Sequence, residues 1–211
     1  SSATSTTNGR QEVAVCDYLL YYPFIDTDAI GEEQVMDNTV TLPRYAAQGG
    51  QVVAVAQSAA SAIGQFTFSY TNQDGVSGRT SQNNYTFIVA GGGQVVGASG
   101  AGASYNPFCY LQVGDTAVRS IESVTMSAAG GGLMCLVIVK PLIKTVVSQE
   151  CRRTTTGNLE SYGACTELSS VIHQAGAPRI LDGAVIGLLA AGYSGSLASS
   201  ILSGALEVIW N

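Results

Sequence analysis

Charged residues are scarce in this sequence. Asp, Glu, Lys and Arg make up 11% of its 211 residues, less than half of the roughly 25% that is usual for globular proteins. The nine basic residues are too few for a continuous track of phosphate contacts, and the net charge of −6 opposes nucleic acid. A surface so poor in charge presents hydroxyls, amides and apolar groups, which neighbouring subunits cover readily. We therefore expect protein partners and no direct nucleic-acid partner.

Metal-binding patterns are also missing. The sequence has one histidine, His173, and five cysteines without any Cys-x-x-Cys spacing, so no usual zinc site is indicated. Three cysteines lie within apolar runs: Cys16, Cys109 and Cys135. We interpret these three as reduced core residues of a protein made in a cytosol, because cysteine in such runs behaves as a small apolar residue. Cys151 and Cys165 have polar neighbours, and a disulfide between them is left open.

Long apolar runs are absent as well. The longest, residues 184–191, is far shorter than the ~20 residues of a membrane-spanning helix. Residues 1–11 are rich in Ser and Thr and lack the apolar centre of a signal peptide. We expect a soluble chain without a membrane partner, and the low complexity of residues 1–11 predicts a flexible N-terminal arm.

The sequence does contain many short segments with the periodicity of β-strands. The clearest is residues 65–71, in which Phe66, Phe68 and Tyr70 alternate with polar side chains. Turn residues separate such segments every 8–12 positions; a helix competes with a strand at residues 184–191, and a helical turn is an alternative at residues 54–62. The pattern predicts an all-β fold: a single-domain β-sandwich over residues 12–211. We prefer a jelly roll because that topology protects most strand edges.

The strongest pair of β segments lies within residues 108–142. Apolar and polar side chains roughly alternate over residues 121–127, which predicts a strand with one buried face. Residues 133–139 have no polar side chain, which predicts a strand covered on both faces. Because a run of small residues ending in three glycines joins the two segments, we predict that they pair as a hairpin. Pro141 is expected to limit the pairing beyond it.

Several constellations partly match functional motifs, but none supports an enzyme. The segment from Asp26 to Asp37 has acids and a glycine at some positions of a calcium loop, yet Ile30 occupies a ligand position. We interpret it as a solvated acidic turn, and a looser calcium site between loops is left open. Ser194 has only His173 as a possible base, and residues 97–102 lack the order of a dinucleotide fingerprint. We predict no catalytic, cofactor-binding or metal-binding residues, and no enzymatic activity.

Four stretches of the C-terminal half resemble virion structural proteins of tailed bacteriophages. They are LQVGDTAVRSIESVT (111–125), GGLMCLVIVKPL (131–142), PRILDGA (178–184) and LEVIW (206–210). The resemblance implies a non-enzymatic, β-rich component of the particle with no active-site residues to carry over. A decoration or cementing protein seated on the capsid is the expected function, and the virion, assembled in the host cytoplasm, is the expected location. Its partners would be other copies of itself in a homo-oligomer, and the major capsid protein or neighbouring virion proteins.

A tail or fibre component with a carbohydrate-binding or adhesion role is the alternative. Such a role needs an aromatic platform in contact with solvent. The candidates are Tyr18, Tyr21, Tyr22, Tyr105 and Tyr110. The capsid role predicts instead a contact surface that is apolar at its centre.

Overall fold

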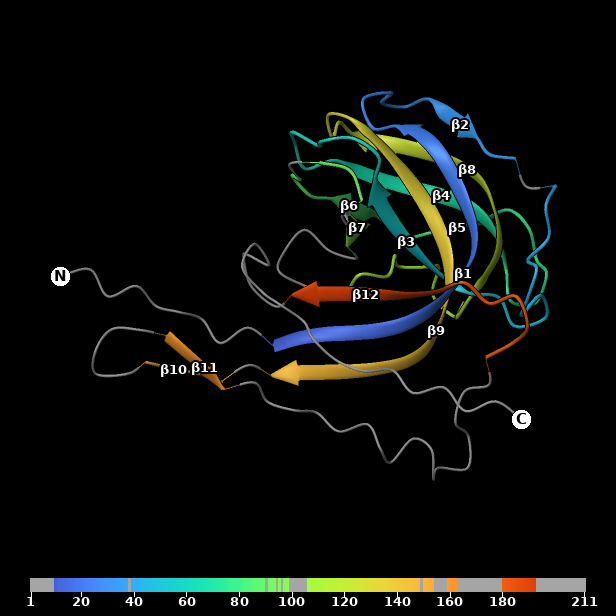
Figure 1. Ribbon diagram of the computed structural model, residues 1–211. Coiled ribbons are helices and arrows are strands. Elements are labelled where there is room, and N and C mark those ends of the chain that lie inside the picture. Colours follow the sequence, from blue (N-terminus) through green and yellow to red (C-terminus); the bar gives the residue numbers. More distant parts are fainter. Residues whose placement is uncertain are drawn as a thin grey trace.

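The computed structural model describes residues 10–37, 39–89, 91–93, 95, 97–98, 106–148, 150–153, 159–162 and 180–192. These residues form strands, bridges, turns and bends, and none of them is helical (Figure 1). The predicted all-β fold is therefore confirmed for the described part of the chain. Residues 184–191, where a helix was the alternative, lie mostly in the strand β12 (Ile186–Gly192).

The first of two main antiparallel sheets has the order β12-β1-β9-β3. Its other members are β1 (Arg10–Asp26), β9 (Leu133–Ser148) and β3 (Gln51–Ala56). The two long strands, β1 and β9, pair from Arg10↔Ser148 to Asp26↔Leu133. The shorter β12 pairs with β1 only as far as Asp17, so about half of β1, residues 18–26, extends beyond it.

The second sheet has the order β2-β8-β4-β6-β7, with β5 paired to β4. Its strands are β2 (Glu33–Val35), β4 (Gln65–Asn72), β5 (Arg79–Thr80), β6 (Asn84–Thr86), β7 (Gly97–Ala98) and β8 (Val118–Ala128). A separate pair, β10 (Glu150–Arg153) and β11 (Leu159–Tyr162), lies apart from both sheets (Figure 1).

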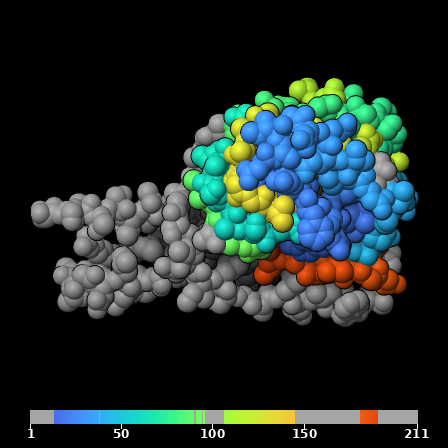
Figure 2. Space-filling model, turned by 90° about the horizontal axis from the view of Figure 1, so that it is seen from above, coloured from blue at the N-terminus to red at the C-terminus, as the bar shows by residue number. Residues whose placement is uncertain are grey.

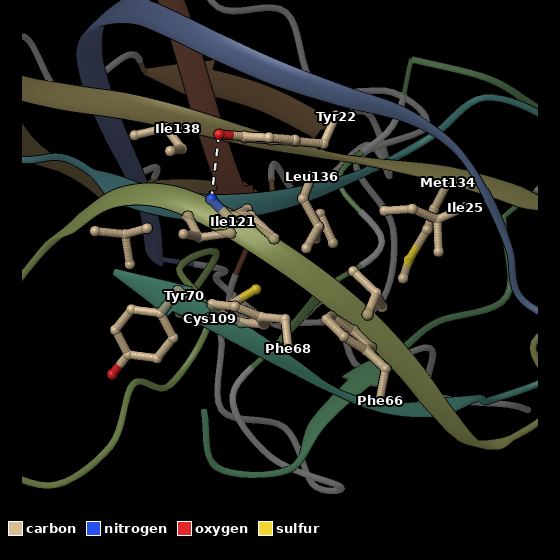
Figure 3. Packing of buried hydrophobic residues seen from close by; sticks show 14 of the residues in the cluster. Tyr22, Ile25, Phe66, Phe68, Tyr70, Cys109, Ile121, Met134, Leu136 and Ile138 are labelled. Carbon is tan, nitrogen blue, oxygen red and sulfur yellow. Dashed lines mark hydrogen bonds between the residues drawn. The ribbon is translucent and has the colours of Figure 1, made fainter. Parts of the chain in front are cut away.

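The main core lies between the two sheets (Figure 3). Phe66, Phe68 and Tyr70 of β4 are all buried, and their neighbours in sequence are only partly buried. The strict alternation over residues 65–71 thus predicted both the strand and its buried face. Each fully buried aromatic or large aliphatic side chain contributes about 1.5–3 kcal/mol relative to an exposed one.

A second apolar cluster covers the opposite face of the first sheet. Val137 and Val139 of β9 belong to it, whereas Met134, Leu136 and Ile138 point into the main core. The prediction that residues 133–139 are covered on both faces is confirmed for residues 134–139, whereas Leu133 is 39% exposed. The partners in the second cluster are Ala14, Cys16, Val53, Phe108 and Leu189.

The predicted hairpin between residues 121–127 and 133–139 is wrong. β8 pairs with β2 and β4, while β9 pairs with β1 and β3, so the two strands lie in different sheets. The glycines between them cross from one sheet to the other. Gly132 has φ +140°, and a Cβ there would lie 2.2 Å from the Ala59 carbonyl oxygen, so the corner needs glycine.

Pro141 does not limit β9, contrary to prediction. The strand continues to Ser148, and Pro141 pairs with Cys16 at a shift in register. Val15 pairs with Ile143, so one extra residue of β9 bulges at this point. A bulge interrupts the regular ladder, and proline, which has no N–H to donate, is tolerated there.

Several predicted features lie partly or wholly outside the described residues. β1 begins at Arg10, two residues inside the predicted arm, and residues 1–9 are not described. Cys151 lies in β10, but Cys165, with which a disulfide was left open, is outside the described residues, as are His173 and Ser194. Of residues 97–102, only the two of β7 are described.

Candidate functional site: a groove between two sheet edges

An open groove lies between the edges of the two sheets. In the described part of the chain, β1 has no strand partner on its outer side once β12 has ended, and β2 forms the end of the second sheet. The groove between them, here called the edge groove, has a volume of about 340 Å³. It is lined by Tyr21, Tyr22, Pro23, Phe24, Gln34, Val35, Met36 and Asp37. The blue atoms in Figure 2 show the end of β1 and β2 together on one face.

Three apolar side chains of the edge groove are largely exposed. The exposed fractions are 70% for Tyr21, 74% for Phe24 and 78% for Val35. Single exposed apolar residues are ordinary on protein surfaces, but a cluster beside a groove is typical of an interaction site. Asp37 is the one charged side chain among the lining residues.

The backbone at Phe24 is strained. Phe24 has φ +62°, a conformation that costs a non-glycine residue about 1–2 kcal/mol. It lies in a bulge, because Tyr22 pairs with Leu136 and Ile25 with Met134, so two residues of β1 face one of β9. The Phe24 N–H donates to the Gln57 Oε1 at 2.6 Å, which holds the bulge in place. An aromatic side chain is thus held outward at an energetic cost.

Gln34 connects the two edges at one end of the groove. The Asp26 N–H donates to Gln34 Oε1 at 2.8 Å, and Gln34 Nε2 donates to the Asp26 carbonyl oxygen, also at 2.8 Å. A side-chain amide therefore occupies the position of a peptide group in a neighbouring strand. This pair of hydrogen bonds fixes β2 beside β1 and closes the groove at this end.

The segment from residue 26 to residue 37, which contains β2, carries five exposed carboxylates, and one of them, Asp37, lines the edge groove. They are Asp26, Asp28, Glu32, Glu33 and Asp37. Asp28 N–H donates to Asp26 Oδ1, and Gly131 N–H donates to Asp28 Oδ1. Hydrogen bonds from the Thr39 N–H and hydroxyl lower the pKa of Asp37. The predicted acidic turn is therefore present, and no group of three or more potential metal ligands occurs among the described residues.

The predicted tyrosine platform is only partly assembled. Tyr21 lies at the edge groove, and Tyr110 is 39% exposed but belongs to the segment between β7 and β8. Tyr22 is buried in the core, so its assignment to the platform is wrong. Tyr18 is half-buried, with its ring against Gly187, and Tyr105 is outside the described residues.

Sequence reasoning missed Phe24, the most strained aromatic residue of the groove. A possible signal is the Pro-Phe pair inside an otherwise continuous β segment, because proline within a strand favours an edge or a bulge. The pattern could not show that the bulge turns the phenylalanine outward.

A second candidate is a polar cluster around Asp115, in the loop before β8. Its carboxylate accepts hydrogen bonds from Tyr70 Oη at 2.6 Å, Asn72 Nδ2 at 2.8 Å and Arg79 Nε at 2.9 Å. Burial alone would raise the pKa of Asp115, but these hydrogen bonds and the Arg79 charge lower it to about 2. A carboxylate already surrounded by donors is a poor proton acceptor, so we interpret the cluster as a tether between this loop and β4.

A third polar contact joins β1 to the segment before β12. Asp17 is fully buried and forms a bidentate ion pair with Arg44, with both N–O distances at 2.7 Å. Asp17 Oδ1 also accepts a hydrogen bond from the Val185 N–H at 2.9 Å. Because both carboxylate oxygens are occupied, this pair positions the start of β12 rather than offering a free acid.

The three described cysteines in apolar runs are unpaired, as predicted. Cys16 and Cys109 are buried, and Cys135 is half-buried. Burial raises the pKa of Cys16 to about 11 and that of Cys109 to about 12. Thiols with such high pKa values are mostly protonated near neutral pH and react slowly, so these residues fill space in the core.

No family model, curated protein or solved structure matches this chain. Among the described residues, the structure contains no helix with the length and apolar character needed to cross a membrane. Evidence on function therefore has to come from the fold and from the edge groove.

Proposed function

We propose that the protein is a non-enzymatic structural component of a bacteriophage particle, acting as a capsid decoration or stabilising protein through subunit–subunit contacts. The observation that carries the proposal is the edge groove, where Tyr21, Phe24 and Val35 are exposed and the Phe24 backbone is strained. Strain of this kind persists where the surrounding structure enforces it, and it concentrates at functional sites. Here it serves to present an aromatic anchor to a neighbouring protein.

We also propose that the fold is a jelly roll. The order β1-β9-β3 in one sheet faces β2-β8-β4-β6 in the other. From β1 to β4 each strand lies in the other sheet from the one before it, β4 to β8 all lie in the second sheet, and β9 returns to the first. Val95 and Phe108, which lie between β6 and β8, form isolated bridges with β3. Two interlocked Greek keys produce this alternation, and jelly rolls occur in viral capsid and lectin domains, which supports a place in a virus particle.

The scarcity of charge supports a contact role over catalysis. Charged residues are 11% of the chain, and the buried Asp17 and Asp115 are both occupied by ion pairs. These groups stabilise loops, and the apolar surface of the edge groove is left for binding. The resemblance of the C-terminal half to tailed-phage virion proteins points in the same direction.

The test is the copy number of the protein in purified particles, measured by quantitative mass spectrometry against the major capsid protein. A decoration protein gives a fixed ratio of copies to shell subunits. A handful of copies per particle indicates a tail or fibre location instead. Absence from particles of the virus that encodes it would refute the proposal.

A carbohydrate-binding role at a tail or fibre is the second candidate, because Tyr21 and Phe24 expose aromatic rings beside the Asp37 carboxylate. Aromatic faces with nearby polar groups suit sugar rings. A glycan array with the intact protein tests this role. Binding that is lost in Tyr21→Ala and Phe24→Ala would favour it, and an array without signal would remove it.

A further inference from the structure

The edge groove exposes the backbone of a strand. Residues 19–23 of β1 have no strand partner on the side away from β9 in the described part of the chain. An exposed strand edge is a template on which another extended segment can form main-chain hydrogen bonds. At about 3.3 Å per residue this edge spans roughly five residues of a bound segment, and its regular part is Leu20 to Tyr22, because the register shifts at Leu19 and before Ile25 and Pro23 has no N–H to donate.

The structure already shows one amide bound at this edge. The Gln34 side chain takes a hydrogen bond from the Asp26 N–H and gives one to the Asp26 carbonyl oxygen. The geometry reproduces two of the hydrogen bonds that a strand would make. The groove therefore binds peptide-like amide groups at the end where β2 closes it.

The walls of the groove suit alternating side chains. Tyr21 and Phe24 project from β1, and Val35 projects from β2 on the other side. In an extended segment every second side chain points to the same side, so alternate apolar residues would lie between these walls. The residues between them would point toward the rim.

The acidic residues of the segment 26–37, here called the rim, favour a partner with basic residues. Five acidic and no basic residues lie between residues 26 and 37, so this segment contributes −5 of the net −6 of the chain. All five carboxylates are exposed. A second copy approaching through the same surface would bring a second set of five, and like charges placed together oppose binding. A segment with basic residues at the rim positions is attracted instead.

We propose that the edge groove binds an extended segment of another protein of the particle, with apolar side chains alternating with Lys or Arg. The segment adds along β1, its apolar residues contact Tyr21, Phe24 and Val35, and its cations lie near Glu33 and Asp37. The inference rests on the proposed function for the source of the segment. The chemical character of the segment, with apolar residues alternating with cations, is inferred from the side chains of the groove.

The test uses the intact protein and capped synthetic peptides of about six residues, one more than the roughly five that the edge spans. The first peptide alternates leucine with lysine. The second replaces each lysine by glutamate, and the third contains the residues of the first as a leucine block followed by a lysine block. Binding is measured by fluorescence anisotropy at about 0.05 M and about 0.5 M salt, and it is located by amide hydrogen exchange.

We expect saturable binding of the alternating lysine peptide, at least about tenfold weaker at high salt. Protection should be confined to residues 19–24 and 33–37. The glutamate and block peptides should bind at least about tenfold more weakly, because one reverses the charge and the other breaks the alternation. Equal binding of the block peptide would overturn the inference, since it would mean unspecific attraction to acidic groups.

Phe24→Gly is the matching variant. Glycine adopts φ +62° without strain, so the fold is retained while the aromatic anchor is removed, and we expect peptide affinity to fall about tenfold. Val113→Gly is the control, because Val113 is 85% exposed in the loop before β8 and outside the groove. Unchanged affinity in Phe24→Gly, or loss of equal size in the control, would contradict the proposed site.

The two proposals fail separately. A fixed copy number on particles without peptide binding would refute the edge groove as a docking site and leave the decoration role standing. Specific peptide binding by a protein that is absent from particles would refute the decoration role alone. Self-association of the chain that Phe24→Gly abolishes would show a second copy in the groove, which overturns the partner assigned here.

Discussion

The Tyr22 hydroxyl connects the two sheets through one buried hydrogen bond. The Ile121 N–H of β8 donates to Tyr22 Oη of β1 at 3.1 Å (Figure 3). Ile121 lies at a bulge, because Ser69 pairs with Ser123 and Tyr70 with Ile121, which leaves Glu122 as the extra residue. A bulge interrupts the ladder, and Tyr22 provides an acceptor for the Ile121 N–H at this point. Tyr22→Phe removes this acceptor and keeps the ring.

The expected loss follows from the burial of the pair. Tyr22 is 4% exposed and Ile121 is fully buried, so water cannot easily replace the hydroxyl. Leaving a buried N–H without a partner costs about 1–3 kcal/mol. The ring remains packed in the main core, so the larger cavity cost of about 3–5 kcal/mol for removing a whole aromatic side chain does not apply. We expect Tyr22→Phe to lower the free energy of unfolding by about 2 kcal/mol.

Urea unfolding followed by far-ultraviolet circular dichroism measures this loss. The midpoint should fall while the slope with urea stays unchanged, because the same surface is exposed on unfolding. The neighbouring Tyr21 is 70% exposed, so Tyr21→Phe is the control and should change stability by less than about 0.5 kcal/mol. A Tyr22→Phe variant as stable as this control would refute the reasoning.

Three further predictions concern the rest of the fold. Because the folded-state pKa of Asp115 is depressed from 3.8 to about 2, its contribution to stability is present above pH 4 and is lost as pH falls through 2. Urea midpoints across this range should drop in the natural protein, and Asp115→Asn should remove that part of the drop. Gly132→Ala should destabilise more than Gly114→Ala in thermal unfolding. Both glycines have positive φ, but a Cβ meets the Ala59 carbonyl oxygen only at Gly132 and nothing within 4 Å at Gly114. In thiol labelling near neutral pH, mapped by mass spectrometry, the half-buried Cys135 should react before the buried Cys109.

The sequence predicts burial well because burial is a local pattern. The alternation around Phe66 and Phe68 identifies β4 and its core face, and the apolar run of residues 133–139 identifies a strand covered on both sides. Both patterns show which side chains are buried, and a window of a few residues is enough to recognise them.

Strand partners could not be predicted in the same way. β1 pairs with β9, and the paired residues Arg10 and Ser148 are far apart in the sequence. The side-chain pattern of β8 and β9 is compatible with a hairpin and equally with two strands in opposite sheets. The chain crosses from one sheet to the other at Gly132. Contact with Ala59 from another loop requires a residue without a Cβ there. Such a contact is visible only once the fold is assembled.

The candidate site could not be predicted from the sequence for a related reason. No motif marks the edge groove, because it results from where strands end. The acidic segment 26–37 was recognisable and was interpreted as a solvated acidic turn, with a looser calcium site between loops left open, and neither interpretation relates its acids to apolar neighbours. The structure places Asp37 of this segment in one groove with Tyr21 and Phe24 of β1, so the relevant pattern combines charge from one segment with apolar surface from its neighbour.

The difference in length between β1 and β12 explains why the groove is open and why it needs protection. β1 has 17 residues and β12 has 7, so among the residues that the structure describes β12 leaves the last part of β1 as an edge. Proteins protect exposed edges with proline, bulges and charge, and all three occur here: Pro23, the bulge at Phe24 and the acidic rim. A fully protected edge would also replace Tyr21, Phe24 and Val35 by polar residues. Because these side chains stay apolar and the rim is acidic, an identical copy is repelled and a basic segment is attracted. The edge therefore discriminates between partners and does not only resist unspecific strand pairing.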